Sequence, residues 1–365
     1  MHRPSLFTSP PNKVHTDGDF LREEVRLANR NHGIHLEALR HDVTPAGMHY
    51  LLIHFDVPYV PEPEAWTLSI GGLVERPSIL RLADLCALQQ RTLRVTLECA
   101  GNGRSLASPR WPSMPWGDCA VGTAEWTGTP LKPLLERAAL LPTCRDIVFT
   151  GADRGFDGVE HDYARSLTPA MAMHDDVLLV TAMNGQPLLP QHGAPLRLIV
   201  PGWYGMASVK WLTRLEAIDH AFQGQQQVGT YVYKQSSDDA GVPVTTMRVK
   251  SLMVPPGLPD WYTRRRAVDA GTVTVHGRAW SGAGVPIRRV EFACGERWQE
   301  AELEEPVASP YAWRGWRCAW TATPGEHVLM CRATDAEGET QPIEQRWDRA
   351  GFGNNMAQRV DVLVR

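Results

Sequence analysis

The residues with the clearest chemical potential are Cys99 and Arg104, which lie in the segment TLECAGNGRS at residues 96–105. The thiolate form of cysteine binds metals, and a guanidinium or a metal nearby favours that form. Gly101 and Gly103 allow the backbone to approach a large ligand closely or to adopt a positive φ. A single cysteine is more often a small buried apolar residue than a ligand, so this segment alone leaves both interpretations open.

The segment strongly resembles the cysteine loop of the sulfite oxidase family of molybdenum enzymes, which carries the pattern Cys-Ala-Gly-Asn-X-Arg. Residues 99–104 match this pattern without a gap. Further motifs extend the resemblance over nearly the whole chain after residue 40: MNGQPL at 183–188, HGAPLR at 192–197, VPG at 200–202, VKWL at 209–212, and GRAWSG at 277–282, which looks like the start of the family's dimerisation domain. The resemblance implies that Cys99 ligates molybdenum held by one molybdopterin, a pyranopterin cofactor.

The resemblance also implies which residues contact this cofactor. A pyranopterin has a phosphate and a hydrogen-bonding ring edge, so its site needs cations and neutral donors. The matching positions are Tyr50, His54, Asp153, His192, Arg197, Ser208, Val209 and Lys210. Each of them alone is more often a solvated charge or a satisfied core residue. Their preserved order along the chain favours the cofactor-binding interpretation.

The substrate pocket of the family is an anion trap beside the metal, built with arginines that pair with oxyanions. Arg104 matches one of these arginines, and Arg359 matches a second that the C-terminal domain contributes. Trp116 matches the pocket tryptophan. The spacing from the VKWL motif favours Tyr231 as the pocket tyrosine, whereas the lysine that follows Tyr233 favours Tyr233.

Two positions depart from the family pattern. Leu52 stands where sulfite oxidases have an arginine, and Pro112 stands where the family often has a lysine. The triplet Arg30-Asn31-His32 is similar to the missing arginine motif but lies about twenty residues too early, and we interpret it as a coincidence. The departures make the predicted pocket less positive, which affects the identity of the substrate more than that of the cofactor.

The resemblance implies a molybdenum-dependent oxidoreductase that oxidises sulfite to sulfate by oxo transfer and passes electrons to an external acceptor such as a cytochrome. One alternative keeps the cofactor and changes the substrate to another sulfur compound, as in a sulfane dehydrogenase or a sulfoxide reductase. A second alternative is an interaction protein that has kept the fold and lost the metal. Elemental analysis for molybdenum separates this last alternative from the other two.

The elements that must position these residues indicate two domains after an N-terminal arm at residues 1–40. Residues 41–245 mix strands, for example at 48–57, 66–70 and 146–150, with helices at 80–89 and 129–140. This mixture lacks a regular βαβ alternation, so an α+β fold with a mixed sheet is expected for the molybdopterin-binding domain. Residues 246–365 show short strands at even spacing, which is typical of an all-β, immunoglobulin-like sandwich. The family resemblance implies that this sandwich makes a homodimer.

The composition limits the partners of the protein. The formal charge of -4 gives no bulk polycation for nucleic acid. No apolar run approaches the ~18 residues that a membrane span needs. Seven cysteines without a CxxC pair favour reduced thiols and a cytoplasmic location. A periplasmic location would require that a signal segment has been removed.

Overall fold

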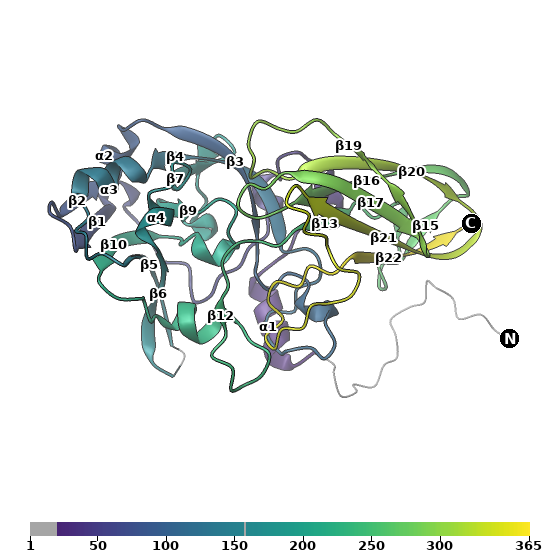
Figure 1. The fold of residues 1–365 in the computed structure, drawn as a ribbon, viewed down its shortest axis with the longest axis horizontal. Coiled ribbons are helices and arrows are strands. Elements are labelled where there is room, and N and C mark those ends of the chain that lie inside the picture. Colours follow the sequence, from purple (N-terminus) through teal and green to yellow (C-terminus); the bar gives the residue numbers. More distant parts are fainter. Residues whose placement is uncertain (1–19, 157) are drawn as a thin grey trace.

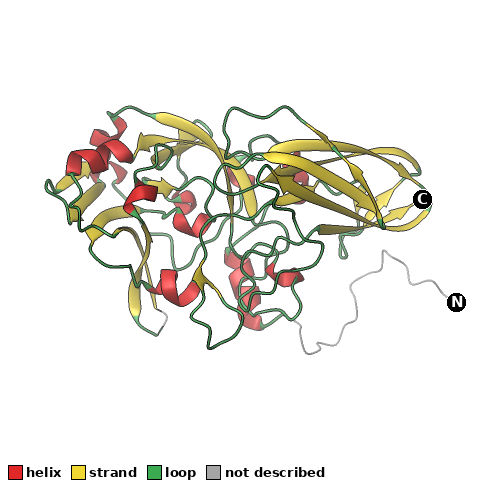
Figure 2. Cartoon of the chain, viewed as in Figure 1, coloured by secondary structure: helices red, strands yellow, loops and turns green. Residues whose placement is uncertain are grey.

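The computed structural model describes residues 20–156 and 158–365, which form two strand-rich parts side by side (Figure 1). Helices are short and lie almost entirely in the N-terminal part (Figure 2). The α-helices are α1 (Arg22–Arg30), α2 (Leu82–Cys86), α3 (Lys132–Ala138) and α4 (Pro169–Ala172), and the described residues also include short 3-10 helices and a π-helix at Gln225–Thr230. Within the described ranges, none of the helices has the length and apolar composition of a membrane span. The part of the predicted arm at residues 1–19 lies outside the described residues.

The N-terminal part contains two sheets. The first has the order β2-β1-β10-β5-β6, and the second has the order β3-β4-β7-β8 with β9 paired to β7. Their bounds are β1 (Thr67–Gly72), β2 (Ser78–Arg81), β3 (Arg91–Glu98), β4 (Val121–Pro130), β5 (Asp146–Phe156), β6 (Glu160–Leu167), β7 (Leu178–Met183), β8 (Gln186–Pro187), β9 (Arg197–Ile199) and β10 (Leu212–Ile218). Because β1 runs parallel to β10 while the other pairs in that sheet are antiparallel, the first sheet is mixed. A shared apolar core, with Phe149, Leu179 and Leu215 among its members, packs between the sheets.

The C-terminal part is a sandwich of two sheets, ordered β13-β16-β20-β19 and β14-β15-β22-β21-β17-β18. Its strands are β13 (Lys250–Met253), β14 (Leu258–Pro259), β15 (Arg266–Val268), β16 (Gly271–Trp280), β17 (Ile287–Cys294), β18 (Arg297–Glu300), β19 (Glu302–Leu303), β20 (Arg314–Ala322), β21 (Gly325–Asp335) and β22 (Gln358–Val364). Side chains in β20 alternate between buried and exposed, as expected when one face of a strand packs on a core. The expected α+β domain followed by an all-β domain is confirmed.

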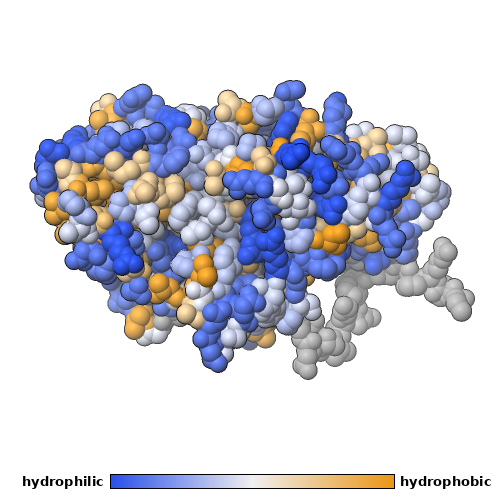
Figure 3. Space-filling view, in the orientation of Figure 1, coloured by the Kyte–Doolittle hydropathy of each residue, from blue (hydrophilic) through white to orange (hydrophobic). Residues whose placement is uncertain are grey.

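The two parts share an apolar cluster. Val121 and Tyr204 from the N-terminal part pack in it with Leu252, Trp280 and Trp313 from the sandwich. The boundary predicted at residues 245 and 246 falls in the connection between β12 (Val242–Pro243) and β13; β12 pairs with β11 (Val232–Tyr233). The face of the molecule in Figure 3 is mostly hydrophilic with dispersed apolar patches. Most large apolar side chains of the described residues are buried.

Two predicted elements are wrong in detail. Residues 48–57 do not form a strand: Met48 ends a 3-10 helix, bends interrupt the rest, and among the described residues their one ladder contact is an isolated bridge between Leu51 and His32. The backbone N–H of Ile53 instead donates to the side chain of Asn31 at 2.7 Å, so a side chain takes the place of a neighbouring strand. The helix predicted at 80–89 is shorter, because residues 78–81 pair with β1 as strand β2 and α2 begins only at Leu82.

Candidate active site

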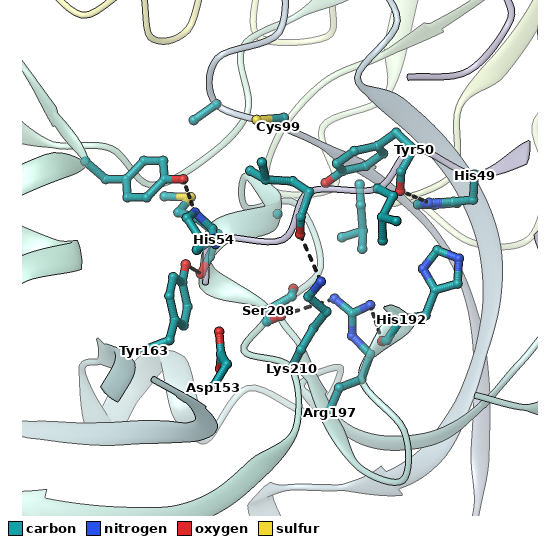
Figure 4. Close-up of a pocket in the computed structure, with 17 residues that line it drawn as sticks. His49, Tyr50, His54, Cys99, Asp153, Tyr163, His192, Arg197, Ser208 and Lys210 are labelled. Atoms are coloured by element: carbon teal, nitrogen blue, oxygen red, sulfur yellow. Dashed lines mark hydrogen bonds between the residues drawn. The ribbon is translucent and has the colours of Figure 1, made fainter. Parts of the chain in front are cut away.

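A pocket opens in the N-terminal part where the ends of several elements meet (Figure 4). The unfilled space between its side chains, counted to its mouth, is about 620 Å³. Its lining includes His49, Tyr50, Leu52 and His54 from residues 48–57, Cys99 after β3, Asp153 on β5, Tyr163 on β6, His192, Arg197 on β9, Ser208, Lys210 and Tyr231. The fold therefore brings Cys99 and most of the predicted cofactor-binding residues to one cavity.

The loop after β3 holds the Cys99 thiol toward this cavity. The backbone N–H of Cys99 donates to the carbonyl of Ala120 at 2.9 Å, and the carbonyl of Cys99 accepts from the N–H of Asn102 at 2.9 Å. Gly103 has a φ of +83°, and a Cβ at Gly101 would lie 2.7 Å from the Arg104 guanidinium. Both glycines are therefore needed for the backbone turn and for the close approach of the cation.

Burial raises the pKa of the Cys99 thiol, while the positive charge of Arg104 acts in the opposite direction. The indole N–H of Trp116, directed at the sulfur, also favours the thiolate. Burial is the larger effect, so the thiolate needs additional positive charge. A metal ion bound to the sulfur would supply that charge.

The polar floor of the pocket is formed by Arg197 and Lys210, which Figure 4 shows on the side away from Cys99. The Arg197 guanidinium donates to the carbonyls of His192 at 2.9 Å and Ser208 at 3.1 Å. The Lys210 ammonium donates to the carbonyl of Leu52 at 2.9 Å. Burial, reinforced by Arg197, lowers the pKa of Lys210 to about 7, and burial lowers the pKa of Arg197 to about 10. Among the described residues, the hydrogen-bond partners of both groups are backbone carbonyls rather than carboxylates.

Three buried polar atoms of this lining have no hydrogen-bond partner among the residues that the structure describes: Arg197 Nε, Asp153 Oδ1 and His49 Nε2. Burial raises the pKa of Asp153 to about 6, against the effect of Lys210. Buried polar atoms are normally paired, so these atoms call for a ligand that offers both donors and acceptors. A ligand with an oxyanion for the cations and a hydrogen-bonding ring edge for Asp153 satisfies this requirement. The residues present therefore fit a pyranopterin.

His54 and Tyr231 both line the pocket and are in contact with each other. His54 Nε2 lies 2.6 Å from the Tyr231 hydroxyl, and the centre of the imidazole lies 4.6 Å from that of the Tyr163 ring, with the two rings tilted by 32°. Burial, together with Lys210, lowers the pKa of His54 to about 3, so the imidazole is neutral. The structure thus places Tyr231 at the pocket. Tyr233 lies outside it, 4.6 Å from the Arg248 guanidinium.

Four predicted residues do not line the pocket. Val209 is buried in the apolar core, and Trp116 and Arg104 are buried outside the pocket lining. Arg359 is the clearest correction, because its side chain is exposed on β22 and pairs with Glu344 at 2.6 Å. Residues 358 and 360 of this strand point inward, so the period-two alternation turns residue 359 to the solvent.

The sequence reasoning missed three contributions. His49 and Tyr163 line the pocket although no motif marked them. The triplet Arg30-Asn31-His32 packs directly beside residues 48–57: Arg30 donates to the carbonyl of His54 at 3.0 Å, and residues 32 and 51 form the isolated bridge. Its similarity to the arginine motif was the signal that could have placed it near His54.

A buried ionic network lies next to the Cys99 loop. Lys250 of the sandwich lies 3.2 Å from Asp118 and 3.5 Å from Glu98, the residue before Cys99. Glu98 also accepts hydrogen bonds from the side chains of Asn102 and Trp280, each at 2.9 Å. Burial disfavours the charged form of Lys250, but the two carboxylates outweigh this effect and raise its pKa. The sandwich therefore contributes a side chain, Lys250, that stays protonated near neutral pH next to the Cys99 loop.

Comparisons with known proteins give matches for both parts of the chain. The family model of the oxidoreductase molybdopterin-binding domain matches residues 54–226, and that of the Mo-co oxidoreductase dimerisation domain matches residues 242–365. The chain is 32% identical to the mitochondrial sulfite oxidases of Mus musculus and Homo sapiens over 88% of its own length and 62% of theirs. It is 30% identical to a nitrate reductase of Hordeum vulgare, of which it covers 39%. The chain thus spans less than two thirds of the length of these relatives.

Among solved structures, the sulfane dehydrogenase SoxCD from Paracoccus pantotrophus is similar over 97% of this chain and 92% of that chain. The TM-score is 0.78 and the sequence identity is 26%. Both comparisons cover the N-terminal part and the sandwich together.

Proposed function

The chain belongs to the sulfite oxidase family of molybdopterin oxidoreductases, and on this premise we propose that it oxidises a small sulfur oxyanion, in the simplest case sulfite to sulfate. Sulfite and water give sulfate, two protons and two electrons, and an external acceptor such as a cytochrome takes the electrons. The observation that carries the proposal is the position of the Cys99 thiol in one cavity with the desolvated cations Arg197 and Lys210.

The cofactor of this family is molybdenum bound to molybdopterin. Cys99 would hold the metal, and Arg197, Lys210, His192 and Ser208 would hold the pterin and its phosphate. When bound, this group supplies oxo-transfer chemistry that exchanges two electrons with the substrate. Burial and His49 lower the pKa of His192 to about 3, so His192 contributes a neutral hydrogen-bonding group rather than a further positive charge.

The remaining residues prepare the pocket for an anion. Arg104 does not line the pocket, but its positive charge favours the thiolate form of Cys99. Tyr231 keeps its proton near neutral pH, because burial raises the pKa of the phenol. The neutral His54 fixes the orientation of the Tyr231 hydroxyl through their 2.6 Å hydrogen bond. The hydroxyl therefore remains available as an oriented polar contact for a bound oxyanion.

Two measurements test this proposal on the purified protein, expressed in a host that makes molybdopterin. Elemental analysis should find stoichiometric molybdenum, and sulfite should drive the reduction of cytochrome c or of an electron-accepting dye. Absence of molybdenum from such a preparation would support the cofactor-free interaction protein instead.

The residues at the pocket favour a second candidate function. This is the oxidation of another sulfur compound, as in a sulfane dehydrogenase. Leu52 presents an apolar side chain to the pocket, and Arg359 is too far out on β22 to add a cation. The likeness to the sulfane dehydrogenase SoxCD agrees with this candidate. Steady-state assays that compare sulfite with a thiol-bound sulfane and with a sulfoxide distinguish the candidates by the ratio of kcat/KM values.

We also propose that the protein is a homodimer held together by the sandwich, because residues 242–365 match the family's dimerisation domain. Light scattering coupled to size-exclusion chromatography should give twice the mass of one chain. A monomer at micromolar concentration would contradict this.

A further inference from the structure

A thiol and an imidazole meet at one end of the sandwich, apart from the pocket that Cys99 lines. Cys294 ends β17, His327 lies near the start of β21, and Trp320 lies near the end of β20. The C-terminus lies at the same end, because the first residues of β21 pair with the last residues of β22 (Figure 1). Cys294 and His327 are both partly exposed, so a small molecule can reach them from the solvent.

His327 is oriented as a base toward the Cys294 sulfur. Its Nε2 lies 2.7 Å from the carbonyl oxygen of Thr323, so this nitrogen carries a proton and donates it. In the neutral imidazole Nδ1 is then an acceptor, and it lies 3.4 Å from Cys294 Sγ, within reach of the S–H group. A nucleophile, a base and a group that orients the base form the arrangement by which proteins activate a thiol.

Trp320 contacts both groups from the opposite sheet. Its indole N–H is directed at the Cys294 sulfur, and its ring lies edge-on to the imidazole with 5.7 Å between the ring centres. Burial raises the pKa of the Cys294 thiol more than the indole lowers it. The resting group is therefore a thiol, and it needs the neighbouring base in order to react as a thiolate.

The other cysteines lack such a partner. Among the residues that the structure describes, no hydrogen bond joins another cysteine sulfur to an imidazole. Cys144 Sγ donates to a backbone carbonyl at 3.5 Å, and Cys318 Sγ accepts from a side-chain amide at 3.2 Å. Cys294 is thus distinguished by its contacts rather than by its exposure, since Cys86 is the more exposed thiol.

We infer that Cys294 is a reactive thiol that small disulfides modify, with His327 as its base. In this step His327 Nδ1 takes the thiol proton, the Cys294 sulfur bonds to one sulfur of the disulfide, and the disulfide bond breaks. The second sulfur leaves as a thiolate and takes the proton back from the imidazolium. Cys294 is thereby oxidised to a mixed disulfide while one half of the disulfide is reduced to a thiol, so the step needs no other oxidant.

Dithiodipyridine, an uncharged aromatic disulfide, tests this inference on the purified full-length protein at neutral pH. Mass spectrometry of proteolytic peptides after increasing reaction times gives the rate at each cysteine. We expect Cys294 to react about tenfold faster than Cys144, which is also partly exposed but has no base beside its sulfur. Equal rates at Cys294 and Cys144 would overturn the inference.

A variant assigns the effect to the imidazole. His327→Phe keeps a ring beside Trp320 and removes the base, so the rate at Cys294 should fall about tenfold while the rate at Cys144 stays the same. His276→Phe, which changes an exposed histidine on β16, should leave both rates unchanged. An unchanged rate at Cys294 in His327→Phe would contradict the inference, and the comparison within the wild type decides it if this variant does not fold. The reaction does not involve the metal site, so its outcome and that of the sulfite assay are independent.

Discussion

Replacing Lys210 by methionine should stabilise the cofactor-free protein at neutral pH while it weakens cofactor binding. In the folded chain the ammonium is held in the pocket floor beside Arg197, and its pKa falls from 10.5 to about 7. The unfolded chain keeps the ordinary value, so between pH 7 and 10 the unfolded state binds more protons than the folded one. The contribution of Lys210 to the free energy of unfolding of the wild type therefore rises with pH in this window. It is most unfavourable below pH 7.

The size of the effect follows from the same values. Each pKa unit corresponds to about 1.4 kcal/mol, so this fall in pKa sets an upper limit of roughly 4–5 kcal/mol on the destabilisation below pH 7. Lys210 is only partly buried from solvent, so water screens part of the cost, and we expect a gain of about 2–3 kcal/mol for Lys210→Met at pH 7. The gain should disappear as the pH approaches 10.

Urea denaturation of the cofactor-free wild type and variant, followed by tryptophan fluorescence at several pH values between 6 and 10, measures this difference. Lys132→Met is a matched control, because Lys132 pairs with Asp175 on the surface and should show no such pH dependence in the difference from wild type. Molybdenum content after expression in a molybdopterin-producing host should fall for Lys210→Met and not for the control. A variant that is less stable than wild type at pH 7, or that keeps full molybdenum content, would refute the reasoning.

Three further predictions follow from the site and its support. Cys99→Ser should abolish sulfite-dependent reduction of cytochrome c and reduce molybdenum content, with the circular dichroism spectrum unchanged; an active, molybdenum-replete variant would exclude Cys99 as the ligand. Leu52→Arg should lower KM for sulfite several-fold if the missing cation limits binding, and an unchanged KM in steady-state assays contradicts that account. Lys250→Met should lower the free energy of unfolding by about 3–5 kcal/mol, because it leaves Glu98 and Asp118 buried without their cation. Urea denaturation measures this loss. If the free energy of unfolding falls no more than it does for the surface control Lys132→Met, the network contributes little to stability.

The Cys99 loop and its glycines could be predicted because their requirements are local. A turn with a positive φ at Gly103 and no side chain at Gly101 follows from the order of residues along one short segment. Except for Val209, the predicted cofactor residues from Tyr50 to Lys210 also line one cavity, as their preserved order along the chain led us to expect.

The failures concern residues whose place depends on partners far along the chain. Arg359 matched a motif, but the register of β22 decides which face it occupies. The apolar run at residues 48–57 reads as a strand, yet Asn31 supplies a hydrogen bond that a neighbouring strand would otherwise make. Lys250 carries no local signal at all, because its carboxylate partners lie more than a hundred residues earlier in the chain.

The ion network under Cys99 makes the sandwich part of the catalytic unit. A fragment that stops before β13 would lack the ammonium of Lys250 and the indole of Trp280, and the end of β3 would then carry uncompensated negative charge next to the thiol. Exchange of the sandwich between related enzymes should therefore succeed only when the donor domain brings a cation to this place. We therefore expect the N-terminal part and the sandwich to be inherited together in evolution.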